Sequence, residues 1–257
     1  MRFLFRHEKP AVLAREPVHA DVPELADAEL AAIYYGQRMA GDFYDFIRVS
    51  PNRVVFGLLD VAGPHDDNRE IIMAAQRTFR SLAAELLAKP EANEAEAMVR
   101  LCIQLNRTIL QAEGGGVRSC PAFAGCYNEG LGTVSYFNAG HTPGLLCHSS
   151  GVAELGATGL PLGLFSHATC DAAMVALEPG AALLVVSRGI VEGRCNGNEF
   201  GLEGVKTSLE GVKAGSATAL CTTILDRVQQ FMCKPPTHDD VTALALLRMA
   251  EIPATRH

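Results

Sequence analysis

The chain has 257 residues, of which 48% are hydrophobic and 20% charged, and its formal net charge is −7. This length is enough to bury a substantial core in one large domain or two small ones. The acidic balance without a basic stripe disfavours nucleic-acid binding. No apolar run suits a signal peptide or a membrane span, so a soluble cytoplasmic protein is expected.

The first predicted elements follow a proline-containing leader at residues 1–25. Strand-like segments lie at 29–36, 43–50 and 53–60. The turn Ser-Pro-Asn at 50–52 predicts that the last two form a hairpin.

Two helices are predicted next. The first is expected to begin near the caps Asp66 and Asp67, to carry apolar residues at helical spacing, and to end at Pro90. The second opens at Asn93 with Glu96 three residues on, which is the pattern of a capping box.

A strand-rich middle follows, with segments at 121–127, 132–140, 142–148, 170–177 and 181–187. Beyond it, an amphipathic helix capped at Ser216 and a strand at 241–248 are predicted. Antiparallel-looking runs of strands, with helices first paired and then single, predict an α+β fold with layered sheets in one domain.

Eight cysteines are present, mostly inside apolar runs, and none forms a CxxC pair. A structural zinc site is therefore not expected. Reduced, partly buried thiols are the prediction for all eight.

Carboxylates occur where apolar strands meet turns. Asp42 follows Gly41, Asp60 ends a buried-type strand, and Asp239 and Asp240 enter the last strand. Each one alone reads as a turn residue or cap. Several converging carboxylates would repel one another and need a cation, and hard oxygen ligands suit Mg²⁺ or Mn²⁺.

The order and surroundings of these residues resemble the PPM (protein phosphatase 2C-like) family of metal-dependent serine/threonine phosphatases, in its bacterial SpoIIE-like branch. The matching pieces occur in family order over roughly residues 25–248: AGDFYDF (40–46), GLLDVAG (57–63), IIMAAQRTFR (71–80), YFNAGHTPGLL (136–146), GLPLGLF (159–165), LLVVSRGIVEG (183–193), NEFG (198–201) and HDDVTALAL (238–246). The resemblance implies a four-layer α-β-β-α sandwich of two antiparallel sheets. It also implies a two-metal centre of Mg²⁺ or Mn²⁺, where a metal-bound water attacks the phosphorus of a phosphoserine or phosphothreonine.

The resemblance also implies roles for individual residues. Asp42 matches the carboxylate that holds metal-bound waters, and Asp60 matches the carboxylate that bridges both metals. The carbonyl of Val61 matches the backbone ligand. Asp239 matches the final metal ligand, with Asp240 as its neighbour.

The turn Asn138–His141 reads NAGH, a sequence common in this branch. For His141 two roles stay open, namely stabilising the turn and direct catalysis.

Two departures from the family fall on the same predicted centre. The family reads Thr-Asp-Gly, with the Asp on a metal, where this chain reads Ser187-Arg188-Gly189. The family loop Gly-His-Gly is replaced by the longer, more acidic run from Gly63 through Pro64 and His65 to Asp67. The loop 62–70 is therefore expected to be displaced or poorly ordered.

Exchanging Asp for Arg changes the local charge by +2, the formal charge of one Mg²⁺ ion. The guanidinium of Arg188 is predicted to lie about 2.7–3.2 Å from Asp60 or Asp239, where it would neutralise the acidic cluster without a metal. The alternative is that Arg188 points outward and pairs with Glu192 or another surface acid. In either case the ligand set for that metal is incomplete.

Three functions are compatible with these residues. The first is a weakly active phosphatase for a phosphoserine or phosphothreonine protein, typically an anti-sigma-factor antagonist in a partner-switching circuit. The second is a pseudophosphatase that binds regulatory partners without hydrolysis. The third is an interaction domain with no surviving site, which the retained carboxylates argue against.

The domain prediction places one phosphatase-like domain at 26–250 and a tail at 251–257. Because few residues precede position 28, no appended sensor domain is expected. Regulation is then expected from expression, from oligomerisation such as a homodimer, or from a separate protein.

Overall fold

The structure, a computed structural model, describes residues 21–35, 41–61, 65–112, 118–210, 215–233 and 240–250, with the side chains of 65–67 left out. Within these ranges ten strands form two five-stranded antiparallel sheets. The first sheet has the spatial order β1 (Ala28–Tyr35), β12 (Val241–Arg248), β9 (Ala182–Val186), β6 (Gly144–His148) and β7 (Gly151–Leu155). The second has the order β2 (Asp42–Ser50), β3 (Arg53–Asp60), β4 (Ala122–Asn128), β5 (Thr133–Ala139) and β8 (Ala173–Ala176).

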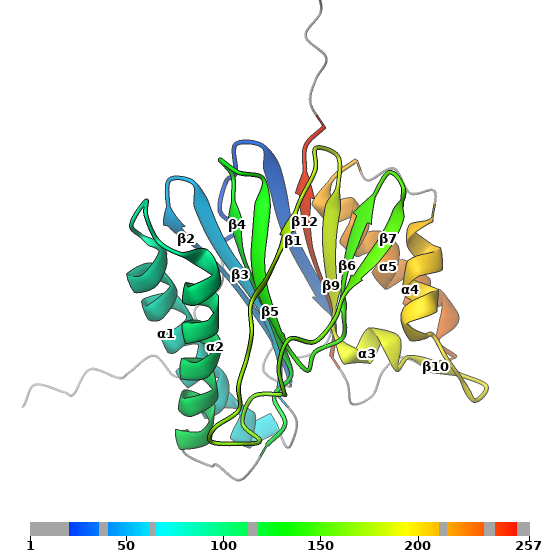
Figure 1. Ribbon diagram of the computed structural model, residues 1–257. Coiled ribbons are helices and arrows are strands. Elements are labelled where there is room, and N and C mark those ends of the chain that lie inside the picture. Colours follow the sequence, from blue (N-terminus) through cyan, green and yellow to red (C-terminus); the bar gives the residue numbers. More distant parts are fainter. Residues whose placement is uncertain are drawn as a thin grey trace, which may run out of the picture.

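Helices cover the outer face of each sheet (Figure 1). The sheet containing β2 and β3 is covered by α1 (His65–Leu87) and α2 (Glu94–Gln111), and the other sheet by α4 (Gly201–Leu209) and α5 (Ala217–Phe231). The short helix α3 (Arg188–Val191) follows β9 and leads into a small hairpin of β10 (Arg194–Cys195) and β11 (Asn198–Glu199). The four-layer α-β-β-α sandwich is therefore confirmed.

The pattern of β9 explains how the layers hold together. Side chains alternate between the two faces of a strand. Leu183 and Val185 accordingly pack between the sheets, whereas Leu184 and Val186 pack towards α5. All four side chains are at most 1% exposed, so the run LLVV is apolar throughout because both of its faces are buried.

Local signals in the sequence placed several boundaries correctly. The hairpin of β2 and β3 forms around the predicted turn, Asn93 caps α2 by accepting a hydrogen bond from the Glu96 amide, and Ser216 caps α5 through the Ala219 amide. Strand β7 and helices α3 and α4 were not predicted.

The predicted caps of the first helix are wrong, whereas the displacement of the loop 62–70 stays a prediction. Helix α1 begins at His65, so Asp66 and Asp67 lie in its first turn rather than before it, and residues 65–70 are helical. Positions 62–64, including Gly63 and Pro64, lie outside the described residues. Most of the predicted leader (1–20) and the tail (251–257) lie outside them as well.

The prediction of eight reduced thiols is also wrong. Cys195 in β10 and Cys233 just after α5 form a disulfide with a Cα–Cα distance of 4.9 Å, and the other six cysteines are free. The two partners are separated by 38 residues, so their proximity is a product of the fold and not of a local motif. Among the described residues no helix is both long and apolar enough to cross a membrane.

Candidate functional site

Two predicted carboxylates meet at one end of the sandwich. Asp42 opens β2 and Asp60 closes β3, and the antiparallel register pairs them directly. Both are 6% exposed. Directly opposed residues of an antiparallel pair point to the same face, so the hairpin places two acidic groups together.

The start of β12 contributes from the other sheet. The Thr242 hydroxyl donates a hydrogen bond to Asp42 Oδ2 at 2.7 Å, and the Asp42 amide donates to Asp240 Oδ2 at 3.4 Å. Ser187 joins the same group, since its hydroxyl donates to the Asp240 carbonyl and accepts from the Thr242 amide. Asp239, the predicted final metal ligand, lies outside the described residues.

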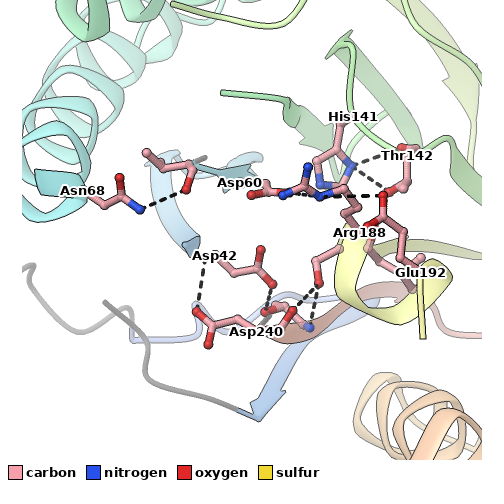
Figure 2. Close-up of polar contacts among 12 residues, drawn as sticks. Asp42, Asp60, Asn68, His141, Thr142, Arg188, Glu192 and Asp240 are labelled. Carbon is pink, nitrogen blue, oxygen red and sulfur yellow. Dashed lines mark hydrogen bonds and ion pairs between the residues drawn. The ribbon is translucent and has the colours of Figure 1, made fainter. Parts of the chain in front are cut away.

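Arg188 reaches into this group from α3. Its Nε lies 3.3 Å from Asp60 Oδ2, slightly beyond the range of about 2.7–3.2 Å expected for a hydrogen bond (Figure 2). The same nitrogen lies 4.0 Å from Glu192 Oε1, and the Arg188 side chain is 47% exposed. The arginine thus forms an ion pair with the buried carboxylate while its outer side borders solvent and Glu192.

Gly189 allows this arrangement. A Cβ atom at position 189 would lie 2.2 Å from the carbonyl oxygen of Asp240. The backbone of α3 therefore passes against the start of β12 at a distance that only glycine permits. Gly41 is not comparably restricted, because a Cβ there would lie 3.6 Å from the Val61 carbonyl oxygen, an ordinary contact.

The Val61 carbonyl is bonded by a residue that the sequence did not single out. Asn68 is fully buried in α1 and donates from Nδ2 to Val61 O at 3.0 Å, while its Oδ1 accepts from Arg118 Nη1 at 2.9 Å. A signal existed, because Asn68 stands four residues before Ile72 on the apolar stripe of α1, and a polar residue there needs a partner. His65 is the first residue of α1, and its side chain is not among those described.

The NAGH turn forms a buried corner beside these residues. Asn138 Oδ1 accepts from the His141 amide at 2.8 Å, and Asn138 Nδ2 contacts the Leu155 carbonyl at 3.3 Å. His141 Nδ1 lies 3.1 Å from the Thr142 carbonyl, and the Thr142 hydroxyl donates to the carbonyl of Val186, two residues before Arg188. These contacts hold the His141 imidazole within the turn, and its role in stabilising the turn or in catalysis stays a prediction.

Burial perturbs two groups in this region. The pKa of Asp42 is raised to about 8, chiefly by desolvation and then by the charge of Asp60, against the hydroxyl groups of Ser187 and Thr242. Burial lowers the pKa of His141 to about 4, with the Thr142 carbonyl acting in the opposite direction. The imidazole is therefore neutral near pH 7.

The oxygen donors have the right chemistry for Mg²⁺ or Mn²⁺, but protein groups already bind the two central ones. Arg188 is paired with Asp60, and Asn68 donates to Val61 O. Among the described residues, no three His, Cys, Asp or Glu side chains are grouped so as to hold a metal ion. As arranged, the described residues, which do not include Asp239, do not make up the two-metal centre that the resemblance implies.

Comparisons with known proteins agree with the fold. The chain is 22% identical over 264 residues to protein IcfG of Synechocystis sp.; the match covers 94% of this chain but 41% of that protein. The RsbU and RsbW domains of Rv1364c from Mycobacterium tuberculosis superpose with a TM-score of 0.70 at 22% identity, covering 90% of this chain and 63% of theirs. The PP2C phosphatase domain of SpoIIE from Bacillus subtilis, with a fragment of its regulatory domain, gives 0.68 at 16% identity, covering 88% and 64%.

A protein-family model also matches most of the chain. The sequence model for stage II sporulation protein E (SpoIIE) matches residues 50–248, which include Asp60, the NAGH turn, Arg188 and β12. With the PP2C-type sandwich and the paired carboxylates at its end, the chain belongs to the SpoIIE family.

Proposed function

We propose that this chain is a SpoIIE-like protein serine/threonine phosphatase domain with a degenerate metal site and weak activity. Its substrate would be a phosphoserine or phosphothreonine protein, such as an anti-sigma-factor antagonist in a partner-switching circuit. Family membership and the similarity to a protein containing RsbU and RsbW domains support the regulatory setting. The observation that supports a degenerate metal site is the ion pair of Arg188 with Asp60.

The chemistry behind this proposal is a substitution of charge. Asp60 and Asp42 are buried side by side, and buried like charges are costly unless a cation compensates them. A guanidinium supplies that compensation with fixed N–H donors. A guanidinium, however, does not coordinate a water molecule and lower its pKa as a metal ion does. It therefore cannot replace a metal in generating a nucleophile.

The remaining attributes of the proposal follow from composition and family. We place the phosphatase domain at residues 26–250 and the protein in the cytoplasm, without nucleic-acid binding. By family resemblance its metal would be Mg²⁺ or Mn²⁺, in one or two sites, with Asp60, Val61, Asp239 and Asp240 as candidate ligands, and the ion pair of Arg188 with Asp60 opposes its binding.

Turnover of a phosphoprotein tests the proposal. The full chain is incubated with Mn²⁺ and a phosphoserine-bearing antagonist protein, and released phosphate is measured against an Asp60→Asn control. Slow hydrolysis that the control lacks supports weak activity. If the parent and the control release phosphate equally, the enzymatic part of the proposal is wrong.

A pseudophosphatase is the second candidate. It is favoured by the observation that the described acidic side chains form no metal-binding group of three. This candidate predicts that the chain binds the phosphorylated partner more tightly than the unphosphorylated one, without consuming it. Calorimetric titration of both forms separates it from the first candidate, and equal affinity for both forms would contradict it.

A further inference from the structure

Two arginines, on opposite sides of Asp60, interact directly or through Asn68 with oxygen atoms that would bind a metal. Arg188 is paired with Asp60 from α3, as described above. Arg118 acts on the neighbouring residue through Asn68 (Figure 2 shows Asn68 and Arg188 on either side of Asp60). The second of these contacts is independent of the first, because it comes through α1 and the segment before β4.

The orientation of the Asn68 amide is fixed by its partners. A guanidinium can only donate hydrogen bonds, so the atom facing Arg118 Nη1 at 2.9 Å must be the carbonyl oxygen of the amide. The NH₂ group is thereby directed to Val61 O at 3.0 Å. The Val61 peptide is also held on its other side, since its amide donates to the Gly41 carbonyl at 2.8 Å.

From this geometry we infer that Asn68, oriented by Arg118, is a positioning residue that makes the Val61 carbonyl a poor ligand for a dication. The inference rests on the proposed function in that Val61 is taken as the former backbone ligand. An N–H donor on a carbonyl oxygen competes with a metal for the same electron density. The guanidinium behind it adds a like charge to any cation bound there.

Arg188 is therefore not the sole element that weakens metal binding at this site. Replacing Arg188 alone leaves the bond from Asn68 to Val61 in place. Full recovery of metal binding requires changes on both sides of Asp60. Metal affinity should therefore depend on both position 68 and position 188. The family motif at residues 187–189 indicates only the second of them.

Mn²⁺ affinity of the full chain, measured by titration calorimetry, tests the role of Asn68 without reference to activity. The Asn68→Ala variant removes the donor without adding a ligand. It should bind Mn²⁺ about tenfold or more tightly than the parent, the scale on which outer-shell partners affect metal affinity. Combination with Arg188→Gln should increase the affinity further than either change alone.

Asn106→Ala is the matched control. Asn106, like Asn68, has a buried side-chain amide. It joins two backbone groups, because it accepts from the Gly163 amide and donates to the Phe165 carbonyl, both at 2.8 Å. Its loss should loosen the fold without changing Mn²⁺ affinity. If both alanine variants change the affinity equally, or neither does, the inference is wrong.

Arg118→Gln keeps the test decisive if Asn68→Ala does not fold. It leaves Asn68 in place and removes the charge together with the guanidinium that orients the amide, so it should tighten Mn²⁺ binding by a smaller factor. Unchanged affinity in this variant would also overturn the inference. Failure of the proposed function would appear elsewhere, as a parent chain that neither binds nor hydrolyses the phosphorylated partner.

Discussion

Asp42 and Asp60 stand directly opposite each other across the β2–β3 ladder, both buried at the end of the sandwich where α3 meets β12. Two carboxylates in that position cannot both be ionised without a cost in free energy. Arg188 compensates Asp60, whereas desolvation by burial, and after it the charge of Asp60, raises the pKa of Asp42 to about 8.

The stability of the metal-free protein, measured in the presence of EDTA, should therefore fall as pH rises. The folded state holds a proton on Asp42 up to about pH 8, whereas the unfolded chain releases it near its ordinary value of 3.8. Between those values the folded state binds more protons, so the free energy of unfolding decreases with pH, by up to about 1.4 kcal/mol per pH unit. Urea denaturation in EDTA across this window measures the slope. Asp42→Asn should flatten it, and parallel curves for the two proteins would contradict the assignment.

Replacing Arg188 should separate charge compensation from metal ligation. With a chelator present, the free energy of unfolding of Arg188→Asp should be about 1–2 kcal/mol lower than that of Arg188→Gln, because Arg188→Asp adds an anion beside Asp60. Saturating Mn²⁺ should reverse that order, since a ligand that binds only the folded state stabilises it.

If the arginine limits catalysis, Arg188→Asp should also raise Mn²⁺-dependent cleavage of p-nitrophenyl phosphate by orders of magnitude. Arg188→Gln serves as the control for both measurements. An Arg188→Asp protein that gains neither stability from Mn²⁺ nor activity would show that the arginine is not the decisive change.

Gly189→Ala should disturb the site through the backbone. A Cβ placed 2.2 Å from the Asp240 carbonyl forces α3 away from β12, which we expect to cost about 1–3 kcal/mol in the free energy of unfolding. Gly156→Ala is the control, because a Cβ at position 156 meets no atom within 4 Å. Thermal denaturation of the two variants makes the comparison, and equal transition temperatures would refute the close approach.

Reduction of the disulfide should lower stability without abolishing the fold. Linking Cys195 to Cys233 across a sequence separation of 38 restricts the unfolded state and stabilises the protein by about 3–4 kcal/mol. Dithiothreitol and the Cys195→Ser variant should give the same reduced transition midpoint in urea. A midpoint unchanged by both treatments would mean that the bond contributes nothing to stability.

The features that local sequence rules could predict are those with local causes. Asn93 and Ser216 cap helices whose first turns lie within three residues of them, and the β2–β3 hairpin turns at Ser-Pro-Asn. The family motifs likewise predict Asp42, Asp60 and Arg188 at one end of the sandwich, where the structure places them.

The features that were missed have distant or weak causes. Helix α4 has nine residues, two of them glycines, and its N-cap makes no side-chain hydrogen bond, so neither propensity nor capping marks it. The bond between Arg118 and Asn68 joins positions 50 residues apart, and the disulfide joins positions 38 apart. Partners at such separations are brought together by the sheets, and no periodicity along the chain predicts them.

Strand β12 occupies the place between β1 and β9, although both precede it in the chain. While a ribosome is still producing the residues before 240, the edges of β1 and β9 that later pair with it have no partner strand, and such edges invite misassembly. Thr242 and Asp240 also arrive only with this segment, and they supply the contacts that join Asp42 to Ser187 across the sheets. A nascent chain can thus form the β2–β3 hairpin early, but the junction that defines the site is completed only after β12 has been synthesised.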